Sequence, residues 1–342
     1  MKKFYLVFAF LLFLIINNWN LFSCSEIFIN NTSKISARNF DFMFSDGLIR
    51  ISPRGQQRES DYTNAGDKKM SWISKFGSVS FLLKLPRLNA EIDSELILAG
   101  IDGINEKGFK VGTYYLADAE FNDSENVTTL SISILMQYLL DNFDSVDSAI
   151  LDITSGKYNV IEVPTELFPI RLHYYLHDIN GNSAIVEFLK GETIIYKNPE
   201  IEVLTNTPYN EALTALKEYD GFGGTNSIPG TQGSIERFVR GAYYAKHLPE
   251  LKSNNYVNFG FAAIQTVSVS PQFDHISTQW TIVTDLMNKM IYFRTLDNPS
   301  ISYIFLEEID FDKLQSEMFL NFTELKLDGN VLNKFDYVPQ KE

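Results

Sequence analysis

This sequence of 342 residues contains one cysteine and four histidines, and these low numbers restrict the kinds of scaffold and metal site that the protein can form. The one cysteine, Cys24, cannot form an intrachain disulfide, which excludes a disulfide-stabilised scaffold. The histidines form no zinc-binding signature, and we interpret all four as structural or surface residues (His173, His177, His247 and His275). We therefore expect no metal site.

Two other recurrent catalytic sequences are absent. There is no Gly-x-Ser-x-Gly nucleophile elbow, and the glycine-rich stretch 221–225 lacks the Gly-Lys-Ser/Thr ending of a phosphate-binding loop. Basic residues are also few, since 29 lysines and arginines stand against 43 acidic residues and give a formal net charge of −14. A surface this acidic repels phosphate backbones, so we expect no nucleic acid partner.

Long apolar runs are missing except at the N-terminus. Lys2 and Lys3 precede an unbroken apolar run of 13 residues, 4–16, which is typical of a signal peptide ending at residue 23. A membrane anchor is the alternative, although this run is shorter than the roughly 20 residues that span a bilayer. We expect an exported protein, periplasmic or secreted, with a single domain over residues 24–342 and no stable membrane insertion after processing.

The lone cysteine lies where the predicted leader ends, and this position suggests a use for it. If cleavage frees Cys24 as the first residue, its α-amino group, with an ordinary pKa of ~7.7–8, lies within reach of its own thiol. One residue then supplies both nucleophile and base, without histidine. Lipidation of Cys24 is the rival interpretation, which Leu21 and Ser23 fit and Phe22 fits poorly.

Periodicity along the chain indicates many strands and a smaller number of helices. Asn180-Gly181 predicts a hairpin, a second hairpin is expected at Met287-Asn288, and Ser145 is a candidate helix cap. Together the elements indicate the α+β class, with sheets stacked and helices outside. The predicted strands are Ser25–Asn30, Ser36–Met43, Leu48–Ser52, Ser78–Leu83, Leu96–Ile101, Phe109–Tyr115, Arg171–His177, Ala184–Leu189, Thr193–Tyr196, Glu202–Thr205, Trp280–Asp285 and Met290–Thr295. The predicted helices are Leu130–Asn142, Val146–Ile153, Asn210–Glu218, Ile235–His247 and Val257–Ser268.

Five short motifs occur in an order and spacing that resemble one family. They are Ala37-Arg38-Asn39-Phe40-Asp41, Asp102-Gly-Ile-Asn-Glu-Lys-Gly-Phe109, Leu204-Thr-Asn-Thr-Pro208, Ile228-Pro-Gly230 followed by Glu236-Arg-Phe-Val-Arg240, and Ser277-Thr-Gln-Trp280. With the residues after Cys24, they resemble the choloylglycine hydrolases, a family of N-terminal-nucleophile hydrolases that includes bile salt hydrolases and penicillin V acylases. The resemblance covers roughly Cys24 to Phe305 and is strongest to the exported penicillin V acylase-like branch. It implies a four-layer αββα sandwich and hydrolysis of linear amides.

The resemblance also implies roles for individual residues beside Cys24. Arg38 and Asp41 are expected to return beside it through a hairpin, Arg38 as a cation that favours the thiolate and Asp41 as the acceptor that orients the amine. Asn206 is expected to donate to the oxyanion, and Arg237 to lower the thiol pKa and hold the amine–carboxylate network.

Tyr114 and Tyr115 end the strand that follows the second motif. The resemblance implies that this strand supplies a pocket residue and a backbone N–H for the oxyanion. Tyr115 stands where bile salt hydrolases carry asparagine and the acylase branch carries an aromatic residue. Arg240 and the motif 277–280 are interpreted as structural, Arg240 as a salt-bridge partner.

The resemblance leaves the substrate open. Penicillin V, conjugated bile salts and N-acyl homoserine lactones all carry an acyl group on a small amine, and Tyr115 favours the acylase branch. The expected partner is a small-molecule N-acyl amide, no cofactor is expected, and the resemblance implies a homo-oligomer, dimer or tetramer. A lipidated, non-catalytic binding protein is the alternative of another class.

Overall fold

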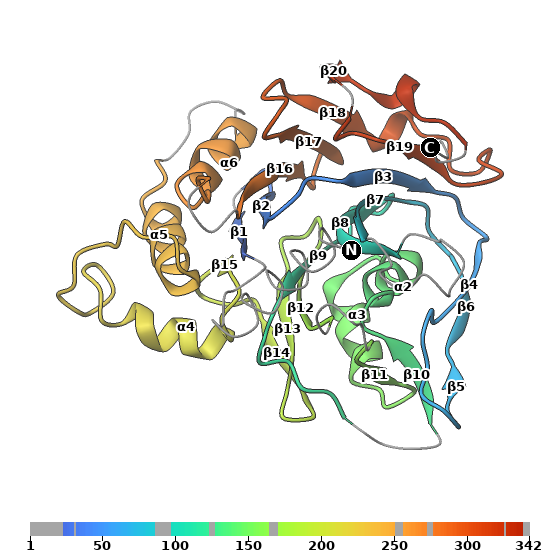
Figure 1. Cartoon of the computed structure of the whole chain (residues 1–342), viewed down its shortest axis with the longest axis horizontal. Coiled ribbons are helices and arrows are strands. Elements are labelled where there is room, and N and C mark those ends of the chain that lie inside the picture. Colours follow the sequence, from blue (N-terminus) through green and yellow to red (C-terminus); the bar gives the residue numbers. More distant parts are fainter. Residues whose placement is uncertain are drawn as a thin grey trace, which may run out of the picture.

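The computed structural model describes residues 23–30, 32–85, 97–122, 127–163, 170–249, 256–271, 276–324 and 326–337. Two large sheets stack face to face, and helices cover the outer face of each (Figure 1). This is the predicted four-layer αββα arrangement, so the α+β class expected from the sequence is confirmed.

The first sheet contains the strand that carries Cys24. Its strands are ordered β15-β1-β2-β16-β17-β18-β20 and are antiparallel except for the last pair, β18 and β20. Their bounds are β1 Ser23–Ile29, β2 Ile35–Phe42, β15 Val203–Leu204, β16 Ser277–Asp285, β17 Met290–Thr295, β18 Ser302–Phe305 and β20 Gly329–Asn330.

The second sheet has eight antiparallel strands in the order β14-β13-β12-β9-β8-β7-β3-β19. These are β3 Gly47–Ser52, β7 Ser78–Leu85, β8 Ile97–Asn105, β9 Lys110–Tyr115, β12 Leu172–His177, β13 Ser183–Leu189, β14 Glu192–Lys197 and β19 Met318–Leu320. Two small sheets lie outside it, one formed by β5 Lys68–Lys69, β10 Thr128–Ser131 and β11 Asn159–Ile161, the other by β4 Gln57–Glu59 and β6 Ser71–Ile73.

Helices pack on the two outer faces. Those on the first sheet follow β15 in the chain, with α5 against β1 and α6 against β2 and β16, whereas α2 packs on β8 and β9 of the second sheet. The helices are α2 Leu135–Asn142, α3 Val146–Ile153, α4 Tyr209–Leu216, α5 Ser234–Lys246 and α6 Tyr256–Gln265, with 3₁₀ turns at η1 Leu306–Glu308 and η2 Leu332–Lys334.

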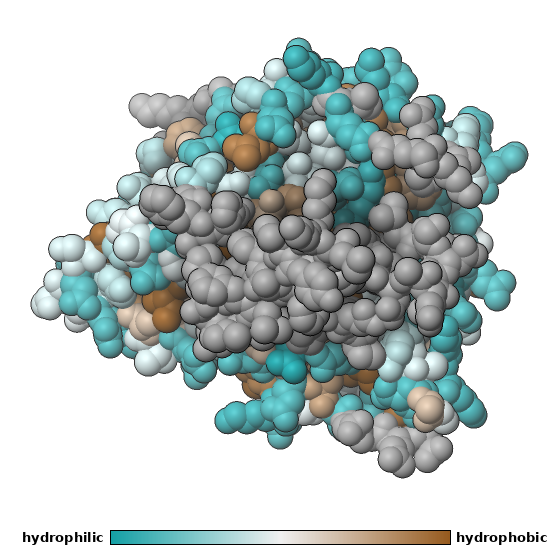
Figure 2. Space-filling model, viewed as in Figure 1, coloured by the Kyte–Doolittle hydropathy of each residue, from teal (hydrophilic) through white to brown (hydrophobic). Residues whose placement is uncertain are grey.

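Two hydrophobic clusters hold these layers together. The larger one lies between the sheets and under α5 and α6, where Phe81 of β7 meets Phe293 of β17 edge to face with ring centroids 5.4 Å apart. The smaller one lies between the second sheet and α2 and α3, and includes Val111 and Leu139. In the face shown in Figure 2, the described surface is mainly hydrophilic with scattered hydrophobic side chains. Among the described residues, no helix is both long and apolar enough to cross a membrane.

All the predicted strands and helices are present, but some bounds differ: β8 continues to Asn105 beyond the predicted end at Ile101, β16 begins at Ser277 rather than Trp280, and α6 ends at Gln265 rather than Ser268. Ser145 accepts a hydrogen bond from the Ser148 amide and caps α3, and both predicted hairpins form, between β12 and β13 and between β16 and β17. Leu130 belongs to β10 rather than to the helix predicted from that residue, and α2 begins at Leu135. Leu130 and Ile132 lie two residues apart, which is the spacing of a strand rather than of a helix, and both side chains fill the smaller hydrophobic cluster.

Candidate active site

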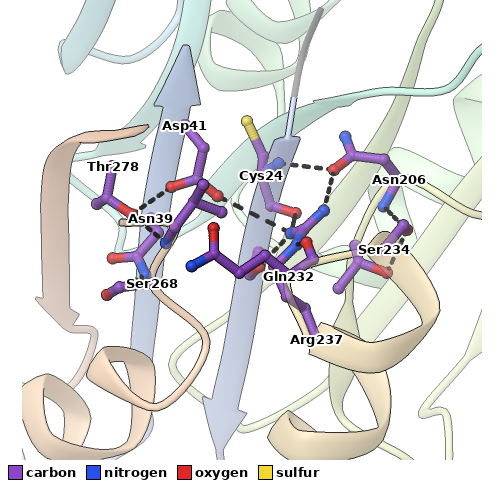
Figure 3. Close-up of polar contacts among 12 residues, drawn as sticks. Cys24, Asn39, Asp41, Asn206, Gln232, Ser234, Arg237, Ser268 and Thr278 are labelled. Atoms are coloured by element: carbon purple, nitrogen blue, oxygen red, sulfur yellow. Dashed lines mark hydrogen bonds and ion pairs between the residues drawn. The ribbon is translucent and has the colours of Figure 1, made fainter. Parts of the chain in front are cut away.

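Cys24 lies near the start of β1, the strand next to the edge strand β15 of the first sheet, and is 2% exposed. The β1–β2 pairing places Phe40 opposite Cys24, Asp41 opposite Ser23 and Arg38 opposite Glu26. The hairpin therefore returns Arg38 and Asp41 beside the cysteine, as the sequence predicted. Figure 3 shows Asp41, Asn206 and Arg237 gathered around Cys24.

The nitrogen of Cys24 faces Asn206, which follows β15 at the edge of the same sheet. In the described chain Ser23 precedes Cys24, so this nitrogen is a peptide amide, and it donates to Asn206 Oδ1 at 2.6 Å. The Asn206 side-chain NH₂ donates in turn to the Tyr115 carbonyl at 2.8 Å. These two bonds fix the orientation of the Asn206 amide.

Arg237, on the first turns of α5, ties these groups together from the helix side of the sheet. Its guanidinium donates to the Cys24 carbonyl at 2.7 Å, to Ser25 Oγ at 2.5 Å and to Asn206 Oδ1 at 3.0 Å. The side chain is 1% exposed, and burial lowers the pKa of the guanidinium. Arg237 thus fixes the backbone of Cys24 and the side chain of Asn206 in one network.

The Asp41 carboxylate lies beside this network with one oxygen bound. Thr278 Oγ1 donates to Asp41 Oδ1 at 2.5 Å, and Arg237 Nη1 lies 3.9 Å from Oδ2 (Figure 3). Oδ2 is buried and has no hydrogen-bond partner among the described residues. Burial raises the pKa of Asp41 to about 7, against the opposing effects of Arg237 and Thr278. The site therefore contains a buried carboxylate oxygen that can accept a further hydrogen bond.

The Cys24 sulfur has different neighbours from the Cys24 nitrogen. Burial raises the pKa of the thiol and the charge of Asp41 adds to this increase, while Arg38 and the Asp41 backbone act in the opposite direction. Arg38 therefore opposes the effect of burial on the thiol pKa, and burial has the larger effect.

The Tyr114 side chain is buried in the layer between the two sheets. It is 0% exposed, its hydroxyl donates to Glu26, and the Arg38 guanidinium lies over its ring at 4.3 Å from the centroid. Alternation along β9 turns this side chain into the layer between the sheets. Tyr114 therefore packs on Arg38, whereas the half-buried Tyr115 follows it and accepts the Asn206 hydrogen bond through its carbonyl.

Several contacts around the site were not predicted. Thr278, interpreted from the sequence as scaffold, binds the Asp41 carboxylate. Ser234 Oγ accepts from the Asn206 amide at 2.9 Å and lies 2.7 Å from Thr207 Oγ1. Thr278 lies within the motif 277–280, and Ser234 lies between the two parts of the motif that ends at Arg240. Their contacts join segments that are far apart in the chain, so no pattern among neighbouring residues predicts them.

The two buried histidines bear on the site indirectly. His173 Nε2 lies 2.9 Å from the Thr205 carbonyl, one residue before Asn206, and Nδ1 lies 3.0 Å from Glu187 Oε1. His177 Nε2 lies 2.5 Å from Glu26 Oε1. Both were expected to be structural or surface residues, and both are fully buried. His247 lies at the end of α5, and His275 is outside the described residues.

Arg240 differs from its prediction as a salt-bridge partner. Its guanidinium donates to the carbonyls of Thr266, Pro229 and Thr231 rather than to a carboxylate. It therefore joins α5 to the loops on either side of the helix layer. Within the described part of the chain, no group of three or more His, Cys, Asp or Glu side chains is placed to hold a metal ion.

The fold and the position of the cysteine define a class of protein. Stacked sheets of mainly antiparallel strands between helical layers, with a cysteine near the start of a strand of the first sheet, are the architecture of the N-terminal-nucleophile hydrolases. Residues 24–319 match the family described as linear amide C–N hydrolases, choloylglycine hydrolase family, and the chain belongs to that family. It is thus an enzyme that hydrolyses carbon–nitrogen bonds of linear amides.

Known relatives agree with this assignment. A penicillin V acylase of Pectobacterium atrosepticum is 28% identical over 304 residues, covering 81% of this chain and 78% of the relative. A bile salt hydrolase/transferase of Clostridium perfringens is 26% identical over 254 residues, 62% of this chain and 74% of the relative. The solved structure of penicillin V acylase from Agrobacterium tumefaciens has a TM-score of 0.76 at 25% identity and covers 93% of this chain and 98% of that one.

Proposed function

We propose that Cys24, freed as an N-terminal residue by cleavage after Ser23, is the nucleophile of an exported hydrolase that cleaves small N-acyl amides. The arrangement around this residue carries the proposal: its nitrogen lies 2.6 Å from Asn206 Oδ1, and Arg38, paired with Glu26 on the same face of the sheet as Cys24, lowers the pKa of its thiol against the effect of burial. Polar groups thus act on both the nitrogen and the sulfur of one buried residue. Such a residue can supply nucleophile and base together.

The freed α-amino group of Cys24 is the proposed general base. Because burial raises the pKa of the thiol, attack at neutral pH needs a base beside the sulfur. Cleavage would turn the amide into an amine with more N–H bonds, and Asp41 Oδ2 has the acceptor capacity to take one of them. Arg237 supports this role by holding the Cys24 carbonyl and the Asn206 side chain in place.

Asn206 is the proposed donor to the oxyanion. Its side-chain NH₂ has two N–H bonds, and the contact with the Tyr115 carbonyl uses one of them. The other would donate to the developing negative oxygen, together with a backbone N–H of the strand that ends at Tyr115. One such donor contributes typically ~2.7–4 kcal/mol to transition-state stabilisation.

The proposed reaction conserves atoms and charge in two stages. The thiol proton passes to the Cys24 amine while the sulfur attacks the amide carbonyl carbon, and the carbonyl electron pair moves to the oxygen held by Asn206. The C–N bond then breaks, the leaving nitrogen takes the proton from the ammonium group, and a thioester remains. Water attacks the thioester, gives a proton to the amine, and releases the acid with the thiol restored.

We propose a penicillin V acylase-like substrate, with an acyl group carried on a small amine. The relatives include a penicillin V acylase and bile salt hydrolases/transferases, so relatedness alone does not choose between these substrates. Tyr115 supports the acylase branch because an aromatic ring at the end of β9 suits a flat acyl group. Conjugated bile salts and N-acyl homoserine lactones are the alternatives.

We further propose that residues 1–23 are a signal peptide, that residues 24–342 form one catalytic domain, and that the enzyme is a periplasmic or secreted homo-oligomer. Residues 1–22 lie outside the described part of the chain. The apolar run after Lys2 and Lys3 supports export. Cell fractionation tests the compartment, and light scattering on the purified protein tests for a dimer or tetramer.

The N-terminus decides whether the proposed chemistry is possible. Intact mass and N-terminal sequencing of protein from its own host should give a chain that starts at unmodified Cys24. A diacylglycerol adduct, or a start at another residue, would contradict the proposal because it leaves no free amine beside the thiol. A lipidated start would support the alternative of a non-catalytic binding protein.

Substitution of the cysteine tests the nucleophile. Cys24→Ala should abolish amide cleavage while circular dichroism and the unfolding midpoint stay close to the parent values. Turnover near the parent rate would refute the assigned nucleophile. In the parent, release of 6-aminopenicillanic acid, of glycine or taurine, or of homoserine lactone identifies which of the three substrate classes is cleaved.

A further inference from the structure

Four charged side chains are buried in the layer between the two sheets, and the proposed reaction uses one of them. Lys110 Nζ lies 2.8 Å from Asp102 Oδ2 and 3.1 Å from Glu26 Oε2, and Asp102 Oδ2 lies 3.4 Å from Arg38 Nη1. These four side chains are between 0% and 3% exposed. We refer to Glu26, Arg38, Asp102 and Lys110 as the inter-sheet cluster.

The topology places this cluster directly beside Cys24. Glu26 follows Cys24 by two residues on β1, so both side chains point to the same face of the strand. Arg38 is paired with Glu26 across β1 and β2, and Asp102 and Lys110 come from β8 and β9 of the opposite sheet. The charges thus alternate from the sulfur outward, in the order Arg38, Asp102, Lys110 and Glu26.

Neutral groups complete the hydrogen bonds of Glu26. Ser36 Oγ donates to Glu26 Oε1 at 2.7 Å, His177 Nε2 lies 2.5 Å from the same oxygen, and the Tyr114 hydroxyl binds Oε2. Burial by itself would raise the pKa of Glu26, but Lys110 and His177 outweigh it and hold that pKa well below its ordinary value. Burial lowers the pKa of His177, against the opposing effect of Glu26. Glu26 is therefore ionised inside the layer.

Arg38 is fixed by contacts with residues of the opposite sheet. Its guanidinium donates to the carbonyls of Thr113, at 2.5 Å, and Ile101, and it lies over the Tyr114 ring. Asp102 is its carboxylate partner, and Lys110 is in turn the partner of Asp102. Arg38 cannot move from the sulfur without breaking contacts to two strands of the opposite sheet.

Stability is a weak reason for such a cluster to persist. Taking each ion out of water costs several kcal/mol, and apolar side chains of similar volume are often as stabilising as a buried ion network. This layer is otherwise filled by apolar side chains such as Phe81 and Phe293. Arg38 lies on the same face of the sheet as Cys24 and its charge acts on the thiol, which gives the cluster a use that apolar packing would not provide.

We propose that Asp102 and Lys110 are positioning residues of the active site, which fix the place of Arg38 beside the Cys24 sulfur and set how much positive charge the sulfur meets. Asp102 reduces that charge by pairing with Arg38, and Lys110 restores part of it by pairing with Asp102. The two residues therefore act on the thiol in opposite directions. This inference rests on the proposed role of Cys24, but its test does not require turnover.

The test is a titration of the Cys24 thiol by the ultraviolet absorbance of the thiolate in purified protein. Cys24 is the only cysteine, so a Cys24→Ser variant provides the blank that subtracts tyrosine absorbance. The other charged groups that act on the thiol, Asp41 and Arg237, stay unchanged in every variant. Asp102→Asn should lower the measured thiol pKa and Lys110→Met should raise it, each by about one unit.

Ser36→Ala is the matched control, because it removes a neutral hydrogen bond from the same cluster and should leave the titration unchanged. A purely structural role predicts shifts of the same sign in Asp102→Asn and Lys110→Met, or none, and either result overturns the inference. If Lys110→Met does not fold, Lys110→Gln replaces it; this change also removes the positive charge, so it must raise the thiol pKa, opposite to Asp102→Asn. Opposite shifts in a protein that cleaves none of the tested amides would support the positioning role and refute the proposed function.

Discussion

Two ion clusters in the described part of the chain differ in their exposure to solvent and in the groups they contact. The inter-sheet cluster is almost free of solvent and ends at the Cys24 sulfur. The other, which we call the outer cluster, consists of Arg50, Arg58, Asp141 and Glu317 on the helix-facing side of the second sheet. Its side chains are up to 23% exposed.

The outer cluster joins elements rather than serving a reactive group. Arg58 pairs with Asp141 of α2 at 3.1 Å and with Glu317, next to β19, at 2.5 Å. Trp72 and Gln137 donate to the same aspartate at 2.7 Å each. Partial solvent contact reduces the desolvation cost of these ions. Similar ion pairs therefore have different roles in the two clusters. The outer cluster joins α2 to the segment before β19, whereas the inter-sheet cluster places a positive charge beside a thiol.

The largest expected difference between the two regions concerns two aspartates that are both fully buried. Asp41→Asn should lower kcat by about 10²–10⁴-fold, because an amide cannot orient the Cys24 amine as a carboxylate does. Asp141→Asn changes the outer cluster in the same way and should leave kcat within about twofold of the parent. Steady-state assays on folded protein measure both rates. Equal losses of kcat in Asp41→Asn and Asp141→Asn would contradict the conclusion that only the first aspartate takes part in catalysis.

Asn206→Ala should lower kcat by about 10²–10³-fold, since it removes one donor to the oxyanion. The variant also frees the Cys24 nitrogen and Arg237 from Asn206 Oδ1. Asn206→Asp therefore serves as a companion, because it keeps the acceptor oxygen and loses the NH₂ donor. If the Asp variant retained the parent kcat, donation by this side chain would play no part in catalysis.

The family resemblance could predict the part of this site that lies close in sequence to Cys24. It implied that Arg38 and Asp41 return beside Cys24 through a hairpin, and the β1–β2 pairing places them there. Long β-branched strands were equally visible, whereas β4, β5, β19 and β20, with two or three residues each, carry too few side chains to show a period.

The inter-sheet cluster was beyond sequence reasoning for a physical reason. Its four residues come from four strands in two sheets, and their contacts depend on how the sheets stack. Nothing in the spacing of Glu26, Asp102 and Lys110 distinguishes them from surface charges on alternating strands. The same holds for Tyr114, whose direction follows from strand alternation once the register is known but not before.

The state of the N-terminus should alter how stability depends on pH. In a chain that keeps Ser23, burial raises the pKa of Asp41 from 3.8 to about 7. The folded state then binds more protons than the unfolded state between about pH 4 and pH 7, so the free energy of unfolding falls as pH rises, by up to about 1.4 kcal/mol per pH unit. Asp41→Asn should remove this slope from the uncleaved chain.

Cleavage before Cys24 should remove the same slope, since an amine beside Asp41 favours the carboxylate. Denaturant unfolding at several pH values measures each curve. Glu202, whose pKa burial also raises to about 7, provides the control: Glu202→Gln should remove an equal share of the slope from the cleaved and uncleaved chains. A slope that persists unchanged after cleavage would argue against contact between the amine and Asp41.

The smallest expected effect belongs to the outer cluster and isolates its role in stability. Arg58→Met should lower the free energy of unfolding by about 1–3 kcal/mol, because Asp141 and Glu317 lose a cation while partial exposure of Arg58 screens part of the loss. The variant should leave both kcat and the thiol titration at the parent values, since Arg58 contacts no residue around Cys24. Urea unfolding gives the first quantity, and the assays described above give the other two. A shifted thiol titration in Arg58→Met would mean that any buried charge in this fold acts on Cys24, and the assignment of that effect to the inter-sheet cluster would fail.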